Sequence, residues 1–247
     1  MNFTESNTVE QMILDAATSL GSGAGSTVLR EEPPSGWGGS LGEEFITSRW
    51  TYVAATALPR QTGEVMVESW LREALIDLNP EIAEQPDRAD EVIYALRAIL
   101  LSVQGDGLVR ANENFCLWLR GEKTMPFGPN GQHVAVRLVD FTQPANNRLT
   151  VTNQWIYQTG SVVKRFDVVF VVNGLPLVIS EAKTPTRRAV TWFDGAYQIN
   201  EIYEKEIPAM FVPNVFSFAT DGRLLRYGSI RMPIDLWGPW RDDDSLS

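Results

Sequence analysis

The 247-residue chain has very little of the two residue types on which zinc sites and histidine catalysis depend. It contains one cysteine, Cys116, and one histidine, His133. A single cysteine excludes an internal disulfide. The two counts together exclude a zinc site built from cysteine and histidine, and most histidine-dependent chemistry. A metal ion bound by this chain would therefore have mainly oxygen ligands, which favours Mg²⁺, Mn²⁺ or Ca²⁺.

Three other features are missing from the sequence. No apolar run approaches the ~20 residues that cross a bilayer, so no membrane partner is expected. Residues 1–5 lack the basic flank and apolar stretch of a secretory signal, and a reducing cytoplasm is the expected location. The glycine-rich segment 21–27 lacks the Gly-Lys-Ser/Thr ending of a phosphate-binding loop, and no apolar strand precedes it. No ATPase motif is therefore visible.

The acidic residues are concentrated in the first half of the chain and in its tail. The net charge is −10, and residues 1–133 hold 9 basic and 19 acidic side chains, whereas residues 134–241 hold 12 basic and 9 acidic ones. The mildly basic second half contains Lys164, Arg165, Lys183, Arg187 and Arg188. Lysine and arginine drive phosphate binding, so this chain alone would hold a polyanion weakly. Any one of these side chains is equally consistent with ordinary solvated charge.

Hydrophobic periodicity predicts helices first and a sheet afterwards. Helices are expected at residues 7–20, 65–78, 89–103, 109–119 and 190–206, and strands at 134–139, 149–155, 166–172, 175–179, 211–218 and 224–227. Segment 21–64 reads as a loop-rich insertion. We expect one domain over residues 1–241, with a helical portion to about residue 120, a sheet-containing core over about 121–236, and an acidic tail at 242–247. The expected fold is a three-layer α/β arrangement with a mixed central sheet flanked by helices.

Two apolar runs, 166–172 and 175–179, are joined by Asn173-Gly174, which is a strong hairpin signal. Because both runs are apolar on both faces, the two strands belong in the middle of a covered sheet. Asp167 begins the first strand, and Glu181 and Lys183 end the second. Side chains alternate along a strand, so Glu181 and Lys183 share one face.

Carboxylates at the ends of buried strands are costly to desolvate unless something pairs with them. A divalent cation bridging Asp167 and Glu181 would do so, with the backbone carbonyl of Ala182 as a third oxygen ligand. Lys183, beside the ion, could hold or deprotonate an attacking water. The alternative is a plain salt bridge at a strand end, because an Asp-x13-Glu-x-Lys spacing alone is degenerate.

The register of this hairpin decides whether the two acids meet. A strict two-residue turn pairs Val172 with Leu175 and Asp167 with Ser180, which turns Asp167 away from Glu181. One bulge, or a three-residue turn, shifts the register by one residue and sets the two acids opposite each other. We predict that irregularity, with Pro176 as a contributor because proline cannot donate to the ladder.

Asp167…Glu181-Ala182-Lys183 resembles the PD-(D/E)xK nuclease signature. Its surroundings resemble the N-terminal domain of the R subunit of type I restriction enzymes, which combines a nuclease with an ATP-driven DNA motor. The stretches that carry this resemblance are 3–10, 78–80, 112–115, 140–141, 146–147, 153–154, 165–167, 172–177, 181–183, 207–208, Phe211, Asn214 and 221–222. They span nearly the whole chain apart from about residues 21–64.

The resemblance implies a restriction-endonuclease-like core and Mg²⁺-dependent cleavage of double-stranded DNA, with Mn²⁺ as a substitute and with little sequence preference. It also implies methyltransferase and specificity subunits as partners. A motor would follow this chain, and ATP would act only through that motor. The acidic tail, 242–247, would lead to it, and the chain would be a fragment of the whole subunit.

Four carboxylate and lysine positions transfer from the family. Asp167, Glu181 and Lys183 fit the signature directly. Glu10 fits the position where many such nucleases place an extra carboxylate on the first helix, as a further metal ligand. The alternative for Glu10 is a first-turn glutamate favoured by the helix dipole or by a capping box.

The family also has a glutamine and a tyrosine four residues apart on the helix after the signature. Here the candidates, Gln198 and Tyr203, are five residues apart. Five residues of α-helix separate two side chains by ~140°, which argues against a shared role, and Tyr203 could equally belong to the core. Arg165, Arg187 and Arg188 are candidates for phosphate contacts, with solvated charge as the alternative.

Two other functions remain open at the level of sequence. A non-catalytic docking module of the same fold would join the motor to its partner subunits. The acidic first half favours that alternative, whereas the intact Asp, Glu and Lys of the signature count against it. A free-standing RecB-like exonuclease would need a basic groove, which this sequence lacks.

Overall fold

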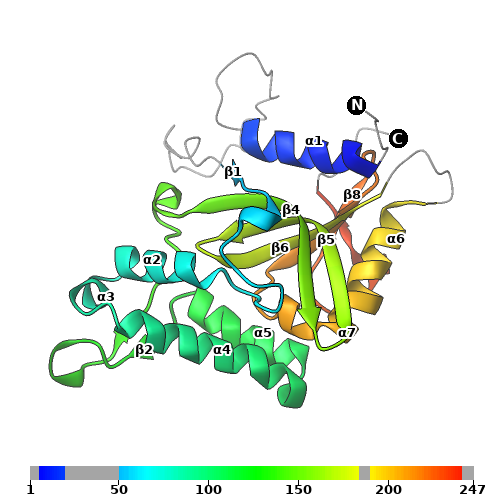
Figure 1. Cartoon of the computed structure of the whole chain (residues 1–247). Coiled ribbons are helices and arrows are strands. Elements are labelled where there is room, and N and C mark those ends of the chain that lie inside the picture. The colour runs from blue at the N-terminus through cyan, green and yellow to red at the C-terminus, as the bar shows by residue number, and fades with distance from the viewer. Residues whose placement is uncertain (1–5, 20–49, 184–189, 241–247) are drawn as a thin grey trace, which may run out of the picture.

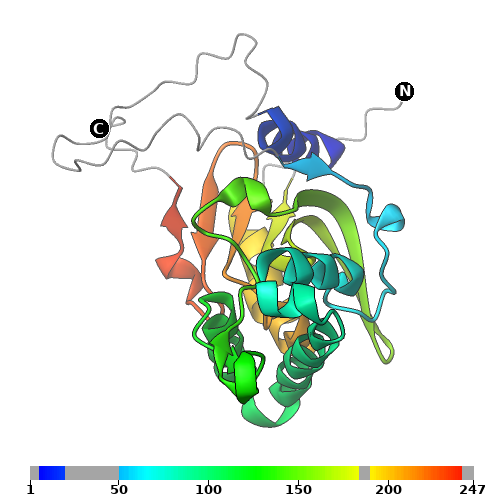
Figure 2. The same cartoon turned by 90° about the vertical axis from the view of Figure 1, so that its left-hand side faces the viewer.

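The computed structural model describes residues 6–19, 50–183 and 190–240. A mixed sheet lies between two helical layers in this part of the chain (Figure 1, Figure 2). Helix α1 (Ser6–Ser19) packs on one face of the sheet, and α2, α4, α5 and α6 pack on the other. The predicted three-layer α/β arrangement is confirmed.

In sequence, the main helical layer precedes six of the seven strands of the central sheet. It consists of α2 (Glu68–Leu78), α3 (Pro80–Glu84), α4 (Arg88–Asp106) and α5 (Leu108–Leu119). The helices predicted at 89–103 and 109–119 are confirmed, because their apolar residues fall on one buried stripe. Proline occupies the first position of α3, where its missing N–H costs nothing. No helix in the described ranges combines the length and the apolar character needed to cross a bilayer.

Helix α2 begins at Glu68 rather than at residue 65 as predicted. Val65, Met66 and Val67 are buried, but they are not helical. The backbone N–H of Val67 donates to the carbonyl of Gly174 in the β5–β6 turn, at 2.8 Å. The apolar residues before α2 therefore attach the helical layer to the sheet, and the sequence pattern did not distinguish this role from helix.

The central sheet has seven strands in the order β1-β4-β5-β6-β7-β8-β9, in which β1–β4 and β6–β7 are parallel pairs. The strands are β1 (Thr51–Tyr52), β4 (Leu149–Thr159), β5 (Val162–Val172), β6 (Leu175–Ala182), β7 (Phe216–Thr220), β8 (Leu225–Gly228) and β9 (Gly238–Pro239). Part of the predicted loop-rich segment thus supplies an edge strand, whereas 21–49 and the tail at 242–247 lie outside the described residues.

The strand predicted at 134–139 is not part of the central sheet. Only β3 (Val134–Ala135) is a strand, and it pairs with β2 (Thr124–Met125) in a separate two-stranded sheet. Beyond β3, the Asn79 side chain forms the hydrogen bonds that a neighbouring strand would otherwise form. It donates to the Arg137 carbonyl and accepts from the Arg137 N–H. The alternating side chains are still buried. The alternating pattern therefore predicted their burial correctly, but it wrongly predicted a strand of the central sheet.

The β5–β6 hairpin contains the predicted irregularity. Val172 pairs with Leu175 around a two-residue turn, in which Asn173 and Gly174 have φ of 51° and 83°. The register shifts between the pairs Val171–Pro176 and Phe170–Val178, which leaves Leu177 as an extra residue on β6. A bulge next to Pro176 is therefore confirmed.

Strands β6 and β7 are parallel and are joined through the helical segment that was predicted at 190–206. That segment consists of α6 (Trp192–Tyr197), η5 (Gln198–Tyr203) and α7 (Glu204–Glu206), and η5 is π-helical. The strand predicted at 211–218 begins only at Phe216, because Pro208–Phe211 forms a 3-10 turn. Proline fixes its own φ and favours a turn start there.

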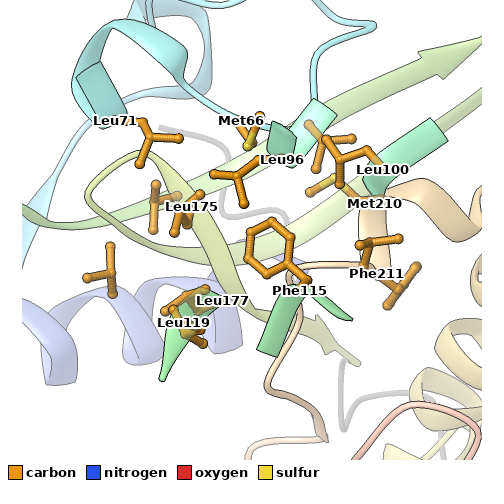
Figure 3. Close-up of a cluster of buried hydrophobic side chains, with 14 of the residues drawn as sticks. Met66, Leu71, Leu96, Leu100, Phe115, Leu119, Leu175, Leu177, Met210 and Phe211 are labelled. Atoms are coloured by element: carbon orange, nitrogen blue, oxygen red, sulfur yellow. The ribbon is translucent and has the colours of Figure 1, made fainter. Parts of the chain in front are cut away.

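Side chains from both the helical layer and the sheet form the larger core (Figure 3). The labelled members are Met66, Leu71, Leu96, Leu100, Phe115, Leu119, Leu175, Leu177, Met210 and Phe211. A smaller core of Leu14, Ala17, Val151 and Val168 lies under α1. The hairpin is thus covered on both faces, as its apolar sequence predicts.

Candidate active site

The candidate site lies at the open end of the β5–β6 hairpin, where the two strands separate. The last pair of the ladder before the strands separate is Val168–Ser180, and one further step in this register sets Asp167 opposite Glu181. The backbone N–H of Ala182 donates to Asp167 Oδ2 at 2.9 Å. The bulge at Leu177 therefore brings the carboxylate of β5 to the end of β6, as the sequence analysis required.

Glu181 is 1% exposed, and its two carboxylate oxygens differ. Oε2 lies 3.2 Å from Lys183 Nζ, whereas the buried Oε1 has no hydrogen-bond partner within the described residues. Burial first, and then the charge of Asp167, raise the pKa of Glu181 well above its ordinary value, while Lys183 acts in the opposite direction. A buried acidic oxygen without a partner, beside a second carboxylate, fits a cation ligand set.

Lys183 is held in place by contacts on both its backbone and its side chain. Its N–H donates to the carbonyl of Thr220 on β7 at 2.8 Å, and its Nζ donates to Gln198 Oε1 at 2.6 Å. Together with the contact to Glu181, these bonds fix the ammonium group next to the acidic pair. The Ala182 carbonyl, at the adjacent peptide, stays a predicted ligand.

Gln198 and Tyr203 meet, and the expectation that their spacing separates them is wrong. That expectation assumed α-helical geometry. Because η5 is π-helical, residues five apart lie on the same face of the helix. Gln198 Nε2 donates to the Tyr203 hydroxyl. Tyr203 is also a core residue, 4% exposed, with its ring edge-on to Phe166. Burial, followed by the Glu181 charge, raises the pKa of the Tyr203 hydroxyl.

Glu10 on α1 is 6% exposed and turns toward strand β4. Its Oε2 accepts a hydrogen bond of 2.8 Å from Gln154 Nε2 and a longer one of 3.5 Å from Asn153. Burial raises the pKa of Glu10, and the nearby Asp167 charge contributes in the same direction. The Glu10 carboxylate thus accepts hydrogen bonds from side chains of β4. The alternative, in which Glu10 caps its own helix, is wrong.

The described ranges contain no group of three His, Cys, Asp or Glu side chains arranged to hold a metal ion. The charge of Asp167 acts on both Glu181 and Glu10, which places Asp167 between the other two carboxylates. The charge of the exposed Arg165 opposes the rise in the pKa of Glu10, while Arg187 and Arg188 lie outside the described residues. Their proposed phosphate contacts stay predictions.

Sequence reasoning missed one residue of the site, Gln154. It bonds to Glu10, and it stands in β4 with φ of +57°, which is unusual for a residue other than glycine. Residues 153–154 were among the stretches that carry the family resemblance, but no role was predicted for Gln154.

Comparison with known proteins matches residues 44–233 to the family described as the type I restriction enzyme R protein N terminus. The type I restriction enzyme HindI endonuclease subunit of Haemophilus influenzae is 36% identical over 183 residues, which cover 73% of this chain and 17% of that subunit. A protein of Methanocaldococcus jannaschii, provisionally named as the type I restriction enzyme MjaIXP endonuclease subunit, is 28% identical over 130 residues. That match covers 49% of this chain and 12% of the relative.

The family match includes Asp167, Glu181, Lys183, Gln198 and Tyr203, whereas Glu10 lies before it. The chain spans less than a fifth of the length of either relative. The match nevertheless extends over most of this sequence, and it contains the whole central sheet apart from β9. The chain therefore belongs to the family of N-terminal domains of type I restriction enzyme R proteins.

Proposed function

We propose that this domain is a metal-dependent endonuclease that hydrolyses the phosphodiesters of double-stranded DNA within a type I restriction enzyme. The observation that carries the proposal is the buried Glu181 Oε1, which has no partner in the described structure and lies beside Asp167. Two adjacent carboxylates and an ammonium group suit this reaction, because a divalent cation uses oxygen ligands and phosphate hydrolysis needs a positioned water.

Asp167 and Glu181 would hold Mg²⁺, with the Ala182 carbonyl as a third ligand and Mn²⁺ as a substitute. A bound ion of this kind polarises the phosphoryl group and lowers the pKa of a coordinated water. Lys183 would hold the attacking water through Nζ, which Gln198 and Glu181 keep in place. Tyr203, through its bond with Gln198, would keep that amide oriented.

The rest of the enzyme would supply most of the affinity for DNA. The chain carries a net charge of −10, and phosphate binding depends on lysine and arginine. We therefore assign most of the DNA-binding affinity, and the use of ATP, to a motor region beyond this chain. Methyltransferase and specificity subunits would be the partners that read the target, so cleavage itself would have little sequence preference.

Cleavage by the assembled enzyme that carries this chain tests the proposal. Glu181→Gln and Lys183→Ala should each lower the rate of DNA cleavage by about 100-fold or more, because each removes a group that acts on the reacting atoms. Glu201→Gln is the matched control, since Glu201 pairs with Lys205 in the same helical segment, away from the acidic pair. Melting temperatures should stay close to wild type. Retained cleavage in either variant would reject the assignment.

A non-catalytic docking module is the second candidate function, and one observation favours it. Tyr94 and Leu101 are 74% and 75% exposed, and they lie seven residues apart, on one side of α4. An exposed apolar pair on an acidic helical layer suits a partner surface. Loss of assembly in Leu101→Asp, together with unchanged cleavage in Glu181→Gln, would favour docking over hydrolysis.

A further inference from the structure

Strand β4 contains one residue with a left-handed backbone, Gln154, whose φ is +57°. This conformation costs a residue with a Cβ of order 1–3 kcal/mol, so it persists only where the surroundings enforce it. The ladder with β5 continues on both sides, through the pairs Asn153–Val168 and Trp155–Phe166. Both pairs belong to one register, so no residue is inserted, and Gln154 stands opposite Asp167.

At this pair, both strands exchange the faces that their side chains occupy. Val151 and Val168 belong to the small core under α1, whereas Trp155 and Phe166 belong to the larger core on the other side of the sheet. In a regular strand, residues 151 and 155 would share a face, and so would 166 and 168. The exchange therefore takes place at the Gln154–Asp167 pair.

The exchange changes what Asp167 binds. Along β6, the Lys183 N–H points to β7, so the Ala182 N–H points to β5. In a continued ladder it would donate to a main-chain carbonyl of β5, but here it donates to Asp167 Oδ2. The Asp167 carboxylate thus takes the place of a backbone acceptor, at the point where the side chains of β5 exchange faces.

The side chain of Gln154 makes a second contribution. Its amide donates to Glu10 Oε2 at 2.8 Å, and Glu10 is buried. Glycine would adopt the same backbone conformation without a steric cost. The strand therefore carries a costlier residue at a position where its amide reaches the carboxylate of α1.

We propose that Gln154 is a positioning residue of the candidate site. Its left-handed backbone turns Asp167 toward β6, and its amide holds the Glu10 carboxylate beside Asp167. The inference deepens the proposed function and rests on it, because Asp167 is a proposed ligand of the cation and Glu10 is the extra carboxylate that the family resemblance predicts near it.

Two substitutions separate the backbone role from the side-chain role. Gln154→Gly allows the left-handed backbone and removes the amide, whereas Gln154→Val opposes that backbone with a β-branched side chain. Gln158→Val is the matched control on the same strand, because Gln158 is exposed and has no positive φ. The 247-residue chain is titrated with Mn²⁺ by calorimetry, and the Ala182 amide is followed by NMR without metal.

Gln154→Gly should raise the Mn²⁺ dissociation constant about 10-fold and leave the Ala182 amide resonance in place, since residues that orient metal ligands contribute 10- to 100-fold in affinity. Gln154→Val should weaken binding by at least as much, move the Ala182 resonance and lower the melting temperature. Gln158→Val should change neither binding nor that resonance. Wild-type affinity in Gln154→Gly would overturn the side-chain role, and an unmoved Ala182 resonance in a folded Gln154→Val would overturn the backbone role.

Failure of the proposed function gives a different result. It would appear as no Mn²⁺ binding by the wild type, or as equal binding by wild type and Asp167→Asn, whatever the Ala182 resonance does. If Gln154→Val does not fold, the strand requires the left-handed conformation, and Gln154→Gly still decides the role of the amide.

Discussion

Each end of the β5–β6 hairpin has one fully buried polar side chain, and the two differ in how many hydrogen-bond partners their atoms have. At the turn, Asn173 is 1% exposed; its Oδ1 accepts from the Arg148 N–H, and its amide donates to the Leu138 carbonyl. At the open end, Glu181 is also 1% exposed, but its Oε1 has no partner among the described residues. Burial alone therefore does not separate a structural polar residue from a candidate functional one.

The difference indicates that the turn stabilises the fold, whereas the open end lowers its stability. A satisfied buried amide is close to neutral or favourable, whereas a buried carboxylate oxygen without a partner carries its desolvation cost. The hairpin turn fastens the sheet to the helical layer through the Val67–Gly174 bond. The open end keeps an acidic oxygen available for a ligand that the protein alone does not provide.

The largest expected effect concerns the turn. Gly174 has φ of +83°, and a Cβ added there would lie 2.3 Å from the Val67 carbonyl oxygen. Gly174→Ala should therefore lower the free energy of unfolding by about 3 kcal/mol or more, or prevent folding, as urea denaturation would show. Gly160→Ala is the control, because Gly160 also has positive φ but no heavy atom near its Cβ position. A loss in Gly174→Ala no larger than that of the control would contradict the fastening role.

The next effect concerns a buried carboxylate that does have partners. Glu204 is 1% exposed; it accepts from the Arg231 N–H at 2.9 Å, and burial raises its pKa to about 7. The folded state thus binds a proton that the unfolded state releases above its ordinary pKa of 4.5. Stability from this group is complete below about pH 4.5 and is lost as the pH rises through 7.

Glu204→Gln should remove that pH dependence, so its stability curve should fall less steeply than wild type between pH 5 and 8. At pH 8 the variant should be more stable by on the order of 1–3 kcal/mol. Glu206→Gln, an exposed neighbour on α7 that pairs with Lys164, should follow the wild-type curve. Parallel curves for wild type and Glu204→Gln, measured by denaturation at each pH, would show that the ionised carboxylate is fully compensated by Arg231.

The smallest effect is a change in the free energy of unfolding that should have opposite signs at the two ends of the hairpin. In EDTA, Glu181→Gln should raise the free energy of unfolding by about 1 kcal/mol, because it removes an acidic group that burial and Asp167 disfavour. Asn173→Ala should lower the free energy of unfolding by about 2 kcal/mol, because it leaves the Leu138 and Arg148 groups without their partner. A loss of stability in both variants would mean that the open end is as structural as the turn.

The bulge in the β5–β6 hairpin was predicted from the hypothesis that Asp167 and Glu181 meet, and not from a local pattern. The hairpin itself could be predicted because its causes are local: Asn173-Gly174 specifies the turn, and two apolar runs specify covered strands. The long helices followed from apolar periodicity for the same reason. In each case the residues that decide the structure are neighbours in sequence.

The remaining features depend on distant contacts. The backbone near Arg137 is captured by Asn79, 58 residues earlier, so an alternating pattern failed to give a sheet strand. The π-helical η5 and the left-handed Gln154 have no reliable local signal, since neither contains glycine or proline. Both lie in the candidate site, where conformations that local preference disfavours are concentrated.

The most direct test of the central claim is calorimetric titration of Mn²⁺ into the 247-residue chain, in wild type and in Asp167→Asn. Asp167 from β5 and Glu181 from β6 are proposed to share one cation, so the wild type should bind one Mn²⁺ and Asp167→Asn should bind it at least 10-fold more weakly. Equal binding by both proteins, or no binding by the wild type, would contradict the claim that the two strands meet around a metal ion.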